Sequence, residues 1–314
     1  MLKDRLRTSA VLISIILVLL YLDGAHSKPG AEGLWLLPLL LFFSLGTARD
    51  MSGLLAASNR LIASKTTLFA TAIVTLSACI PLLWPLVGET YPVNCPVGRL
   101  GWIVIASVTA IFIILLREMK DYGIGPEGAI ERTCNAVFVS LYAGLPMALL
   151  VCLRSLGSGN WGLAALLTMI LVTKSTDAGA YFTGKAIGKH KLIPRLSPGK
   201  TKEGSLGGIL TATIVAFVCL QWLFPWVAGG GMPPGKTPSI TFLANPLWGA
   251  AVLGPTLALT GMIGDLAESL VKRDCGAKDS GSWLPGLGGV WDVTDSLIAA
   301  IAPAFLCFAA GVGG

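Results

Sequence analysis

Charged residues are scarce in this chain. Asp, Glu, Lys and Arg make up 13% of its 314 residues, whereas hydrophobic residues make up 54% and the mean hydropathy is +0.75. Typical globular proteins carry about 25% charged residues, which keep their surfaces soluble. The composition therefore excludes a soluble domain of this length and indicates a polytopic membrane protein.

Histidines are also few, and the cysteines lack the spacing of a metal-binding motif. The chain has two histidines, and its seven cysteines show no CxxC spacing. An odd number of cysteines, mostly within apolar segments, argues against a disulfide framework or a zinc site and favours small buried side chains. Any metal should then be a hard cation held by carboxylates, so magnesium is favoured over zinc.

Long apolar runs predict nine transmembrane helices, because a helix needs about 20 mostly apolar residues to cross the hydrocarbon core. The runs lie near residues 9–23, 32–47, 68–88, 99–117, 134–153, 161–183, 205–228, 247–269 and 296–312. We therefore predict an all-α, polytopic integral membrane protein. The first run follows a basic start and also fits a cleavable signal peptide, which would leave the orientation of the other helices unchanged.

Basic residues predict how these helices are oriented. Most of the 23 Lys and Arg residues fall in alternate connections, on the side that holds the N-terminus. Lys and Arg are enriched in the connections on the cytoplasmic side of a membrane, so we expect a cytoplasmic N-terminus. The net charge of +6 resides mainly in these connections. It fits anionic lipid headgroups rather than nucleic acid, so the lipid bilayer is the expected partner.

The charged residues that are present gather near the C-terminus. Within residues 261–295 they are Asp265, Glu268, Lys272, Arg273, Asp274, Lys278, Asp279, Asp292 and Asp295. If the start of this segment is helical, four polar residues share one face: Asp265, Glu268, Ser269 and Lys272. A charge at the centre of a membrane helix costs about 2.5 to 3.5 kcal/mol, so such groups normally line a site.

A second polar stretch spans residues 174–204. It opens with Lys174, Asp177 and Tyr181 at helical spacing and continues through segments rich in Gly, Lys and hydroxyl side chains. Glycines let the backbone approach a ligand, and lysines neutralise phosphate. The run at 199–201 reads Gly-Lys-Thr but is not a Walker A loop, because Pro194 stands where that loop needs glycine. The backbone N–H groups that open the seventh span could face an anion.

Three aspartates are candidate metal ligands. Asp292 and Asp295 lie three residues apart, which on a helix places their Cβ atoms about 5 to 6 Å from each other. Asp265 could add a third carboxylate from a neighbouring helix. Such a set could hold one or two magnesium ions, which stabilise the charge that develops when a nucleotidyl group is transferred.

Several of these segments resemble a known family. Residues 269–273, 278–279 and 285–295 resemble the signature of the phosphatidate cytidylyltransferases, also called CDP-diacylglycerol synthases. Earlier segments are similar to further motifs of that family in the same order: 177–184, 188–191, 197–204 and 264–265. The resemblance covers the chain from the sixth span onward. We accordingly divide the chain into a transmembrane scaffold (1–133) and a catalytic region (134–314).

The resemblance implies a magnesium-dependent transfer of CMP from CTP to phosphatidate, giving CDP-diacylglycerol and pyrophosphate. It implies that the enzyme lies in the cell inner membrane or plasma membrane with its site facing the cytoplasm, and it suggests a homodimer. The implied catalytic residues are Asp265, Lys272, Asp292 and Asp295, with the three aspartates binding the metal. The implied substrate-binding residues are Asp177, Tyr181, Lys189, Ser197, Lys200, Thr201, Glu203, Ser269, Arg273, Lys278, Asp279, Gly288 and Gly289.

Two positions depart from the family pattern. The family usually has His where this chain has Leu287, and Arg where it has Val293. Because of these departures, a catalytically degenerate relative stays open. Two further functions are also open: a CTP-dependent lipid kinase of the polyprenol type, which would use similar groups, and a transporter. The product separates the kinase from the transferase. A transporter would place its polar groups near the middle of the membrane, whereas here they cluster at one end of the spans.

Overall fold

The computed structural model describes residues 2–92, 94–124, 127–157, 159–229 and 240–314. In this part of the chain, eight helices are long and apolar enough to cross a membrane, and a bent helix pair makes a ninth candidate. The strands found in the described ranges form one two-stranded sheet and an isolated bridge. The chain is therefore an all-α polytopic membrane protein, which confirms the fold class predicted from hydropathy.

The chain divides into two compact units. The first contains residues 1–152 and 271–294, and the second contains residues 153–270 and 295–314. The sequence-based boundary between residues 133 and 134 was drawn on functional grounds and remains a prediction. The compact units instead group the C-terminal segment 271–294 with the N-terminal part of the chain.

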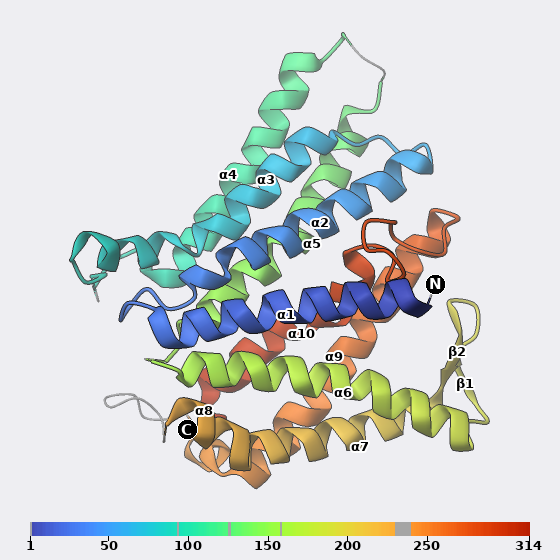
Figure 1. The fold of residues 1–314 in the computed structure, drawn as a ribbon. Helices are drawn as coiled ribbons and strands as arrows, with labels where there is room; N and C mark the ends of the chain where they lie inside the picture. The colour runs from blue at the N-terminus through green and yellow to red at the C-terminus, as the bar shows by residue number, and fades with distance from the viewer. Residues whose placement is uncertain (1, 93, 125–126, 158, 230–239) are drawn as a thin grey trace. The chain divides into compact units, whose positions relative to one another are not determined.

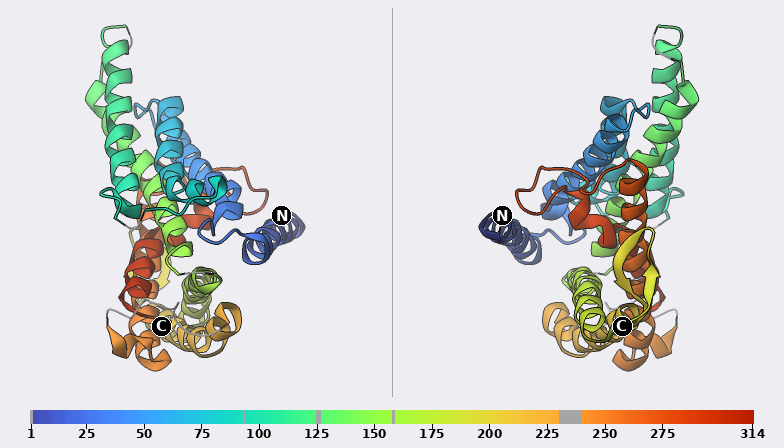
Figure 2. Two further views of the ribbon diagram at one scale, coloured as in Figure 1. Left: turned by 90° about the vertical axis from the view of Figure 1, so that its left-hand side faces the viewer. Right: turned by 90° about the vertical axis from the view of Figure 1, so that its right-hand side faces the viewer.

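The first unit is built from the helices that precede residue 153. They are α1 (Leu2–His26), η1 (Leu34–Leu36), α2 (Leu37–Ala57), α3 (Ser64–Ser77), η2 (Ile80–Val87), α4 (Gly98–Asp121) and α5 (Ala129–Arg154). Helices α3 and α4 lie side by side (Figures 1 and 2). The core that α3 and α4 share with α5 consists mainly of small side chains: Ala70, Val74, Ala110, Ile114 and Ala136. Small residues let membrane helices approach closely, which favours van der Waals packing between them.

Helix α2 is longer than predicted. The second predicted span ends at residue 47 and leaves Arg49 in a connection, but α2 continues to Ala57, so that boundary was wrong. The helix continues because both of its charged groups are accommodated. Asp50 is only 6% exposed and accepts a hydrogen bond from the backbone of Trp291, and the Arg49 guanidinium lies 4.2 Å from the centre of the Trp283 ring.

The third predicted span, residues 68–88, consists of two helical pieces. Helix α3 ends at Ser77, and the 3-10 helix η2 follows with a bend of 53° between the two. Pro81 and Pro85 explain the change, because proline lacks the N–H that an α-helix needs and crowds the preceding turn.

The second unit contains the remaining elements. They are α6 (Trp161–Ile187), β1 (Lys191–Ile193), β2 (Ser197–Thr201), α7 (Lys202–Val218), the π-helical turn η3 (Cys219–Leu223), α8 (Phe224–Ala228), η4 (Thr241–Ala244), α9 (Pro246–Asp274) and α10 (Trp291–Ala310). The boundary with the first unit falls within α5, α9 and α10.

Helices α6 and α7 run side by side, and the antiparallel hairpin β1–β2 joins them at one end (Figure 1). Glycine allows this close packing. A Cβ atom added to Gly204 would lie 2.8 Å from the carbonyl oxygen of Ala180, which is closer than real Cβ contacts. Residues 197–201, which belong to the second polar stretch of the sequence, therefore form a strand held against this helix pair.

Candidate functional site

Three acidic side chains meet in the second unit. Asp265 and Glu268 lie on α9 and Asp295 lies on α10, and one oxygen from each lies within 4.8 Å of the others. Glu268 is 2% exposed and Asp295 is 8% exposed. Gly264 makes this convergence possible, because a Cβ atom there would collide with the backbone of Asp295. We call Asp265, Glu268 and Asp295 the carboxylate cluster.

The carboxylate cluster has the chemistry of a hard-cation site. Two carboxylates this close repel each other when both are ionised, so a cation bound between Glu268 and Asp295 would relieve that repulsion. Carboxylate oxygens are the ligands that magnesium prefers. Lys174 supplies positive charge nearby: its Nζ donates to Ser296 Oγ at 3.0 Å, and its charge acts on Asp295. Magnesium therefore fits this set of donors.

A pocket of about 440 Å³ adjoins the cluster in the same unit. Most of its polar lining comes from the two sequence segments singled out above: Asp177, Tyr181, Lys185, Lys200, Thr201 and Asp265. Lys200 Nζ lies 2.5 Å from Asp265 Oδ2, which connects the hairpin to the carboxylate cluster. The pocket can therefore place an anionic group beside a bound cation.

Two residues predicted to contact substrate hold the hairpin in place. Thr201 is buried, and its Oγ1 accepts a hydrogen bond from the backbone N–H of Gly204 at 3.1 Å, which caps the start of α7. The Glu203 carboxylate accepts from the backbone N–H of Lys189 at 3.1 Å and contacts His190 Nδ1 at 2.6 Å. The structure thus gives Thr201 and Glu203 structural partners.

Asp292 organises a loop in the first unit. Its Oδ1 accepts from Lys272 Nζ at 2.8 Å. Its Oδ2 accepts from the Ser280 backbone N–H at 3.0 Å, from Ser280 Oγ at 2.7 Å and from the Gly289 N–H at 2.7 Å. Gly289 has no room for a Cβ atom, which would collide with Ser280 Oγ and with Asp50. Two predicted catalytic residues and one predicted substrate residue therefore belong to one hydrogen-bonded network.

The other predicted residues lie in less constrained positions. Arg273, Lys278 and Asp279 are exposed in the first unit. Gly288 has a φ of +97°, which favours glycine, and precedes the bonded Gly289. In the second unit, Ser269 is half-buried on α9 and Ser197 pairs with Ile193 in the hairpin. Substrate contacts for these residues remain predictions.

The two departures from the family pattern also lie in the first unit. Leu287 donates its backbone N–H to the Leu284 carbonyl at 2.9 Å, within a tight turn. Val293 follows Asp292 directly on α10 and is half-buried. Both positions belong to the segment that contains the Asp292 network.

The predicted set of site residues leaves out four residues with evident local roles: Asp50, Lys174, Glu268 and Ser280. Glu268 and Lys174 carried a usable signal, because each lies three residues from a predicted site residue on a helix. Asp50 had a weaker signal, a carboxylate directly after a predicted apolar span. Ser280 carried no signal at all, because its role depends on how the loop folds around Asp292.

Together, the fold and the carboxylate cluster define a membrane protein in which three carboxylates meet beside a pocket lined by two lysines. Comparison with known proteins specifies the class further. The model of the cytidylyltransferase family matches residues 3–310, so the chain belongs to that family.

Bacterial relatives are similar over part of their length. A Brucella suis protein named phosphatidate cytidylyltransferase is 42% identical over 166 residues, which are 52% of this chain and 53% of the relative. A Bacillus subtilis protein of the same name is 38% identical over 189 residues, 60% of this chain and 63% of the relative. An uncharacterized Escherichia coli protein is 37% identical over 147 residues, 47% of this chain and 43% of the relative. The chain thus spans about half the length of the curated relatives it matches.

Proposed function

We propose that this protein transfers CMP from CTP to phosphatidate and so forms CDP-diacylglycerol and pyrophosphate in the synthesis of membrane phospholipids. The observation that carries the proposal is the family match across residues 3–310. The names of the Brucella suis and Bacillus subtilis relatives support phosphatidate as the lipid acceptor. The carboxylate cluster and the adjoining pocket supply groups that suit this chemistry.

In the proposed reaction, a phosphate oxygen of phosphatidate attacks the α-phosphorus of CTP. The bond from that phosphorus to the oxygen bridging to the β-phosphorus breaks, and its electron pair leaves with pyrophosphate. The attacking phosphate is already anionic at neutral pH, so the site needs no strong general base. Catalysis then depends on orienting the two substrates and neutralising their charge.

The residues of the second unit would supply much of that neutralisation. Magnesium bound at Asp265, Glu268 and Asp295 would offset charge on the phosphate oxygens. Lys185 and Lys200 line the pocket and can bind phosphate groups of CTP or of the lipid. Lys200 also orients Asp265 through their ion pair. In the first unit, Lys272 holds Asp292, and we propose that both act on the same reaction.

We further propose that the enzyme lies in the bacterial inner or plasma membrane with its site facing the cytoplasm, where CTP is available. The bias of the basic residues supports this orientation. Assembly as a homodimer, which the family resemblance suggests, is part of the same proposal.

Position-specific labelling of CTP tests the reaction directly. Purified protein in detergent is incubated with magnesium, phosphatidate and CTP labelled at either the α- or the γ-phosphorus. The proposal expects α-label in a lipid product and γ-label in pyrophosphate. Transfer of γ-label to a polyprenol or diacylglycerol acceptor would instead identify a lipid kinase. Absence of labelled lipid with every acceptor, from protein that keeps a cooperative thermal transition, would indicate a degenerate relative.

A further inference from the structure

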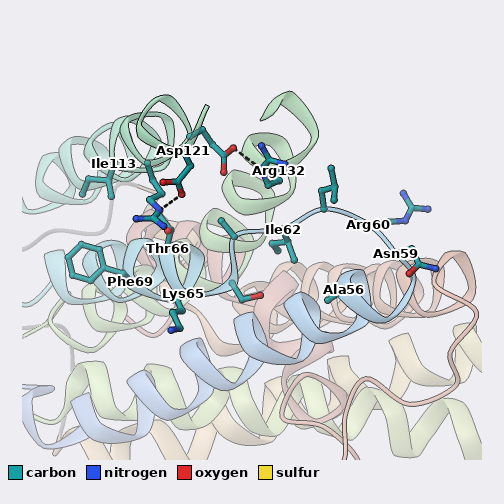
Figure 3. Close-up of a pocket in the computed structure, with 15 residues that line it drawn as sticks. Ala56, Asn59, Arg60, Ile62, Lys65, Thr66, Phe69, Ile113, Asp121 and Arg132 are labelled. Carbon is teal, nitrogen blue, oxygen red and sulfur yellow. Dashed lines mark hydrogen bonds and ion pairs between the residues drawn. The ribbon is translucent and has the colours of Figure 1, made fainter. Parts of the chain in front are cut away.

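The first unit contains a separate cavity of about 970 Å³ (Figure 3). It lies where the connection between α2 and α3 meets the start of α3, the end of α4 and the start of α5. None of the residues predicted to act in the reaction lines this cavity. The basic-residue bias predicts that these helix ends lie at the cytoplasmic surface of the membrane. The cavity therefore requires an explanation of its own.

Two helices each present one cationic and one apolar side chain to this cavity. On α3, Lys65 lies one turn before Phe69, and on α4, Arg117 lies one turn after Ile113. Helix α3 starts at the connection end and α4 finishes there, so on both helices the cation is nearer the surface and the apolar side chain is deeper. Phe69 is 58% exposed. The cavity thus combines a cationic mouth with an apolar wall.

Most charged groups around the mouth are already paired. Glu118 is 8% exposed and binds Arg132 Nε at 2.8 Å, and Asp121 binds Arg117 Nε at 2.7 Å (Figure 3). Both acidic groups of the lining are therefore neutralised. Lys65 is exposed, and it has no ion-pair partner within the described ranges. Its ammonium group gives the mouth a net attraction for an anion.

The start of α3 adds hydrogen-bond donors to this positive charge. The Thr67 N–H donates to the Ala63 carbonyl at 2.9 Å, and among the described residues no side chain caps the start of the helix. The preceding N–H groups, on residues 64–66, belong to the uncapped first turn, where donors point away from the helix toward any bound anion. These donors strengthen an anion site that the cavity and Lys65 already define.

We propose that this cavity binds an anionic phospholipid from the surrounding leaflet. The lipid phosphate would lie at Lys65 and the terminal amino groups of Arg117, and one acyl chain would cover Phe69 and Ile113. A lipid fits better than a small soluble anion, because only a lipid also covers the apolar wall. Basic pockets between transmembrane helices at the cytoplasmic surface are suited to such headgroups. This binding does not depend on the proposed catalytic function.

Competitive lipid binding to the full chain tests the inference. The purified protein in detergent is mixed with equal amounts of phosphatidylglycerol and phosphatidylcholine, and bound lipids are counted by native mass spectrometry. Phosphatidylglycerol is chosen because it is anionic but lacks the phosphate monoester of phosphatidate. We expect wild-type protein to prefer phosphatidylglycerol, and Lys65→Gln to weaken its binding about tenfold.

Lys120→Gln is the matched control, because Lys120 is also exposed near the end of α4 but does not line the cavity. It should keep the wild-type preference. Millimolar inorganic phosphate, added as a competitor, should displace little phosphatidylglycerol from wild-type protein. Phe69→Ala should weaken phosphatidylglycerol binding and leave this effect of phosphate unchanged. Equal losses from Lys65→Gln and Lys120→Gln would overturn the inference. Complete displacement of the lipid by inorganic phosphate would also overturn it, because the occupant would then be a soluble anion.

Discussion

Asp50 on α2 accepts a hydrogen bond at 3.1 Å from the backbone N–H of Trp291, which lies 241 positions further along the chain. Trp291 is the first residue of α10, where an N–H has no partner within the helix. A carboxylate at this position also interacts favourably with the helix dipole. The N-terminal part of the chain therefore caps the helix that carries Asp292.

Replacing Asp50 should affect both stability and turnover. Asp50→Ala leaves the buried N–H of Trp291 unpaired, which costs about 1 to 3 kcal/mol. It should also reduce turnover, because the Gly289 turn and Asp292 lose their support. Thermal unfolding in detergent and the CMP-transfer assay measure the two effects. Glu89→Gln, at an exposed position, is the control and should change neither. Wild-type stability of Asp50→Ala would show that the cap contributes nothing.

Asp292→Asn should abolish turnover while the protein stays folded. The amide has one acceptor oxygen in place of two, so it cannot accept from Lys272 and from the Ser280 and Gly289 donors as the carboxylate does. Initial rates and a melting curve on the same sample separate loss of function from unfolding. Ser280→Ala removes one of these bonds and should give an intermediate rate. Near-wild-type turnover by Asp292→Asn would remove Asp292 from the catalytic set.

Loss of one carboxylate from the cluster should raise the magnesium requirement. For Glu268→Gln and Asp265→Asn we expect at least a tenfold increase in the magnesium concentration that gives half-maximal turnover. Magnesium should also raise the melting temperature of wild-type protein and do so less for the variants, because a ligand stabilises the folded state that binds it. Glu127→Gln, at an exposed position, should behave like wild type. If wild type and all three variants gave identical magnesium titrations, the metal would not bind at the carboxylate cluster.

Lys272 should contribute more to turnover in this chain than in relatives that have arginine at the position of Val293. Without an arginine at Val293, positive charge must come from other groups. Lys272→Ala should therefore reduce turnover at least about tenfold, or ~1.4 kcal/mol of transition-state stabilisation. The double change Leu287→His with Val293→Arg tests the same idea from the opposite direction. A silent Lys272→Ala, together with activity that appears only in the double variant, would identify a degenerate relative.

Thiol labelling tests the predicted orientation. Cysteines introduced at Lys189 and at Asp279, both exposed, should resist a membrane-impermeant reagent added outside intact cells. The half-exposed native Cys95 lies in a connection predicted to be external, so it should react and serves as a positive control. Labelling at Lys189 or Asp279 in intact cells would reverse the predicted topology.

Hydropathy predicted the helices well, because a membrane span is a local property of about 20 consecutive residues. Helical spacing likewise placed Asp265 beside Glu268, although Glu268 was then left out of the metal set. The partners of Asp50 could not be predicted, because contacts between residues so distant in sequence depend on tertiary packing. The structural role of Thr201 was missed for a related reason: its hydroxyl caps α7, and the hydrogen-bonding groups of a cap resemble those of a phosphate site.

The position of Gly289 between Ser280 and Asp50 limits how this protein can be divided. A fragment that starts at residue 134 would retain the Gly289 turn and Asp292 but lose Asp50, which contacts that turn and caps α10. Residues 1–133 are therefore more than a passive membrane anchor for the rest. If the two parts were produced as separate polypeptides, we expect that the C-terminal part would become competent only after it had reassembled with α2.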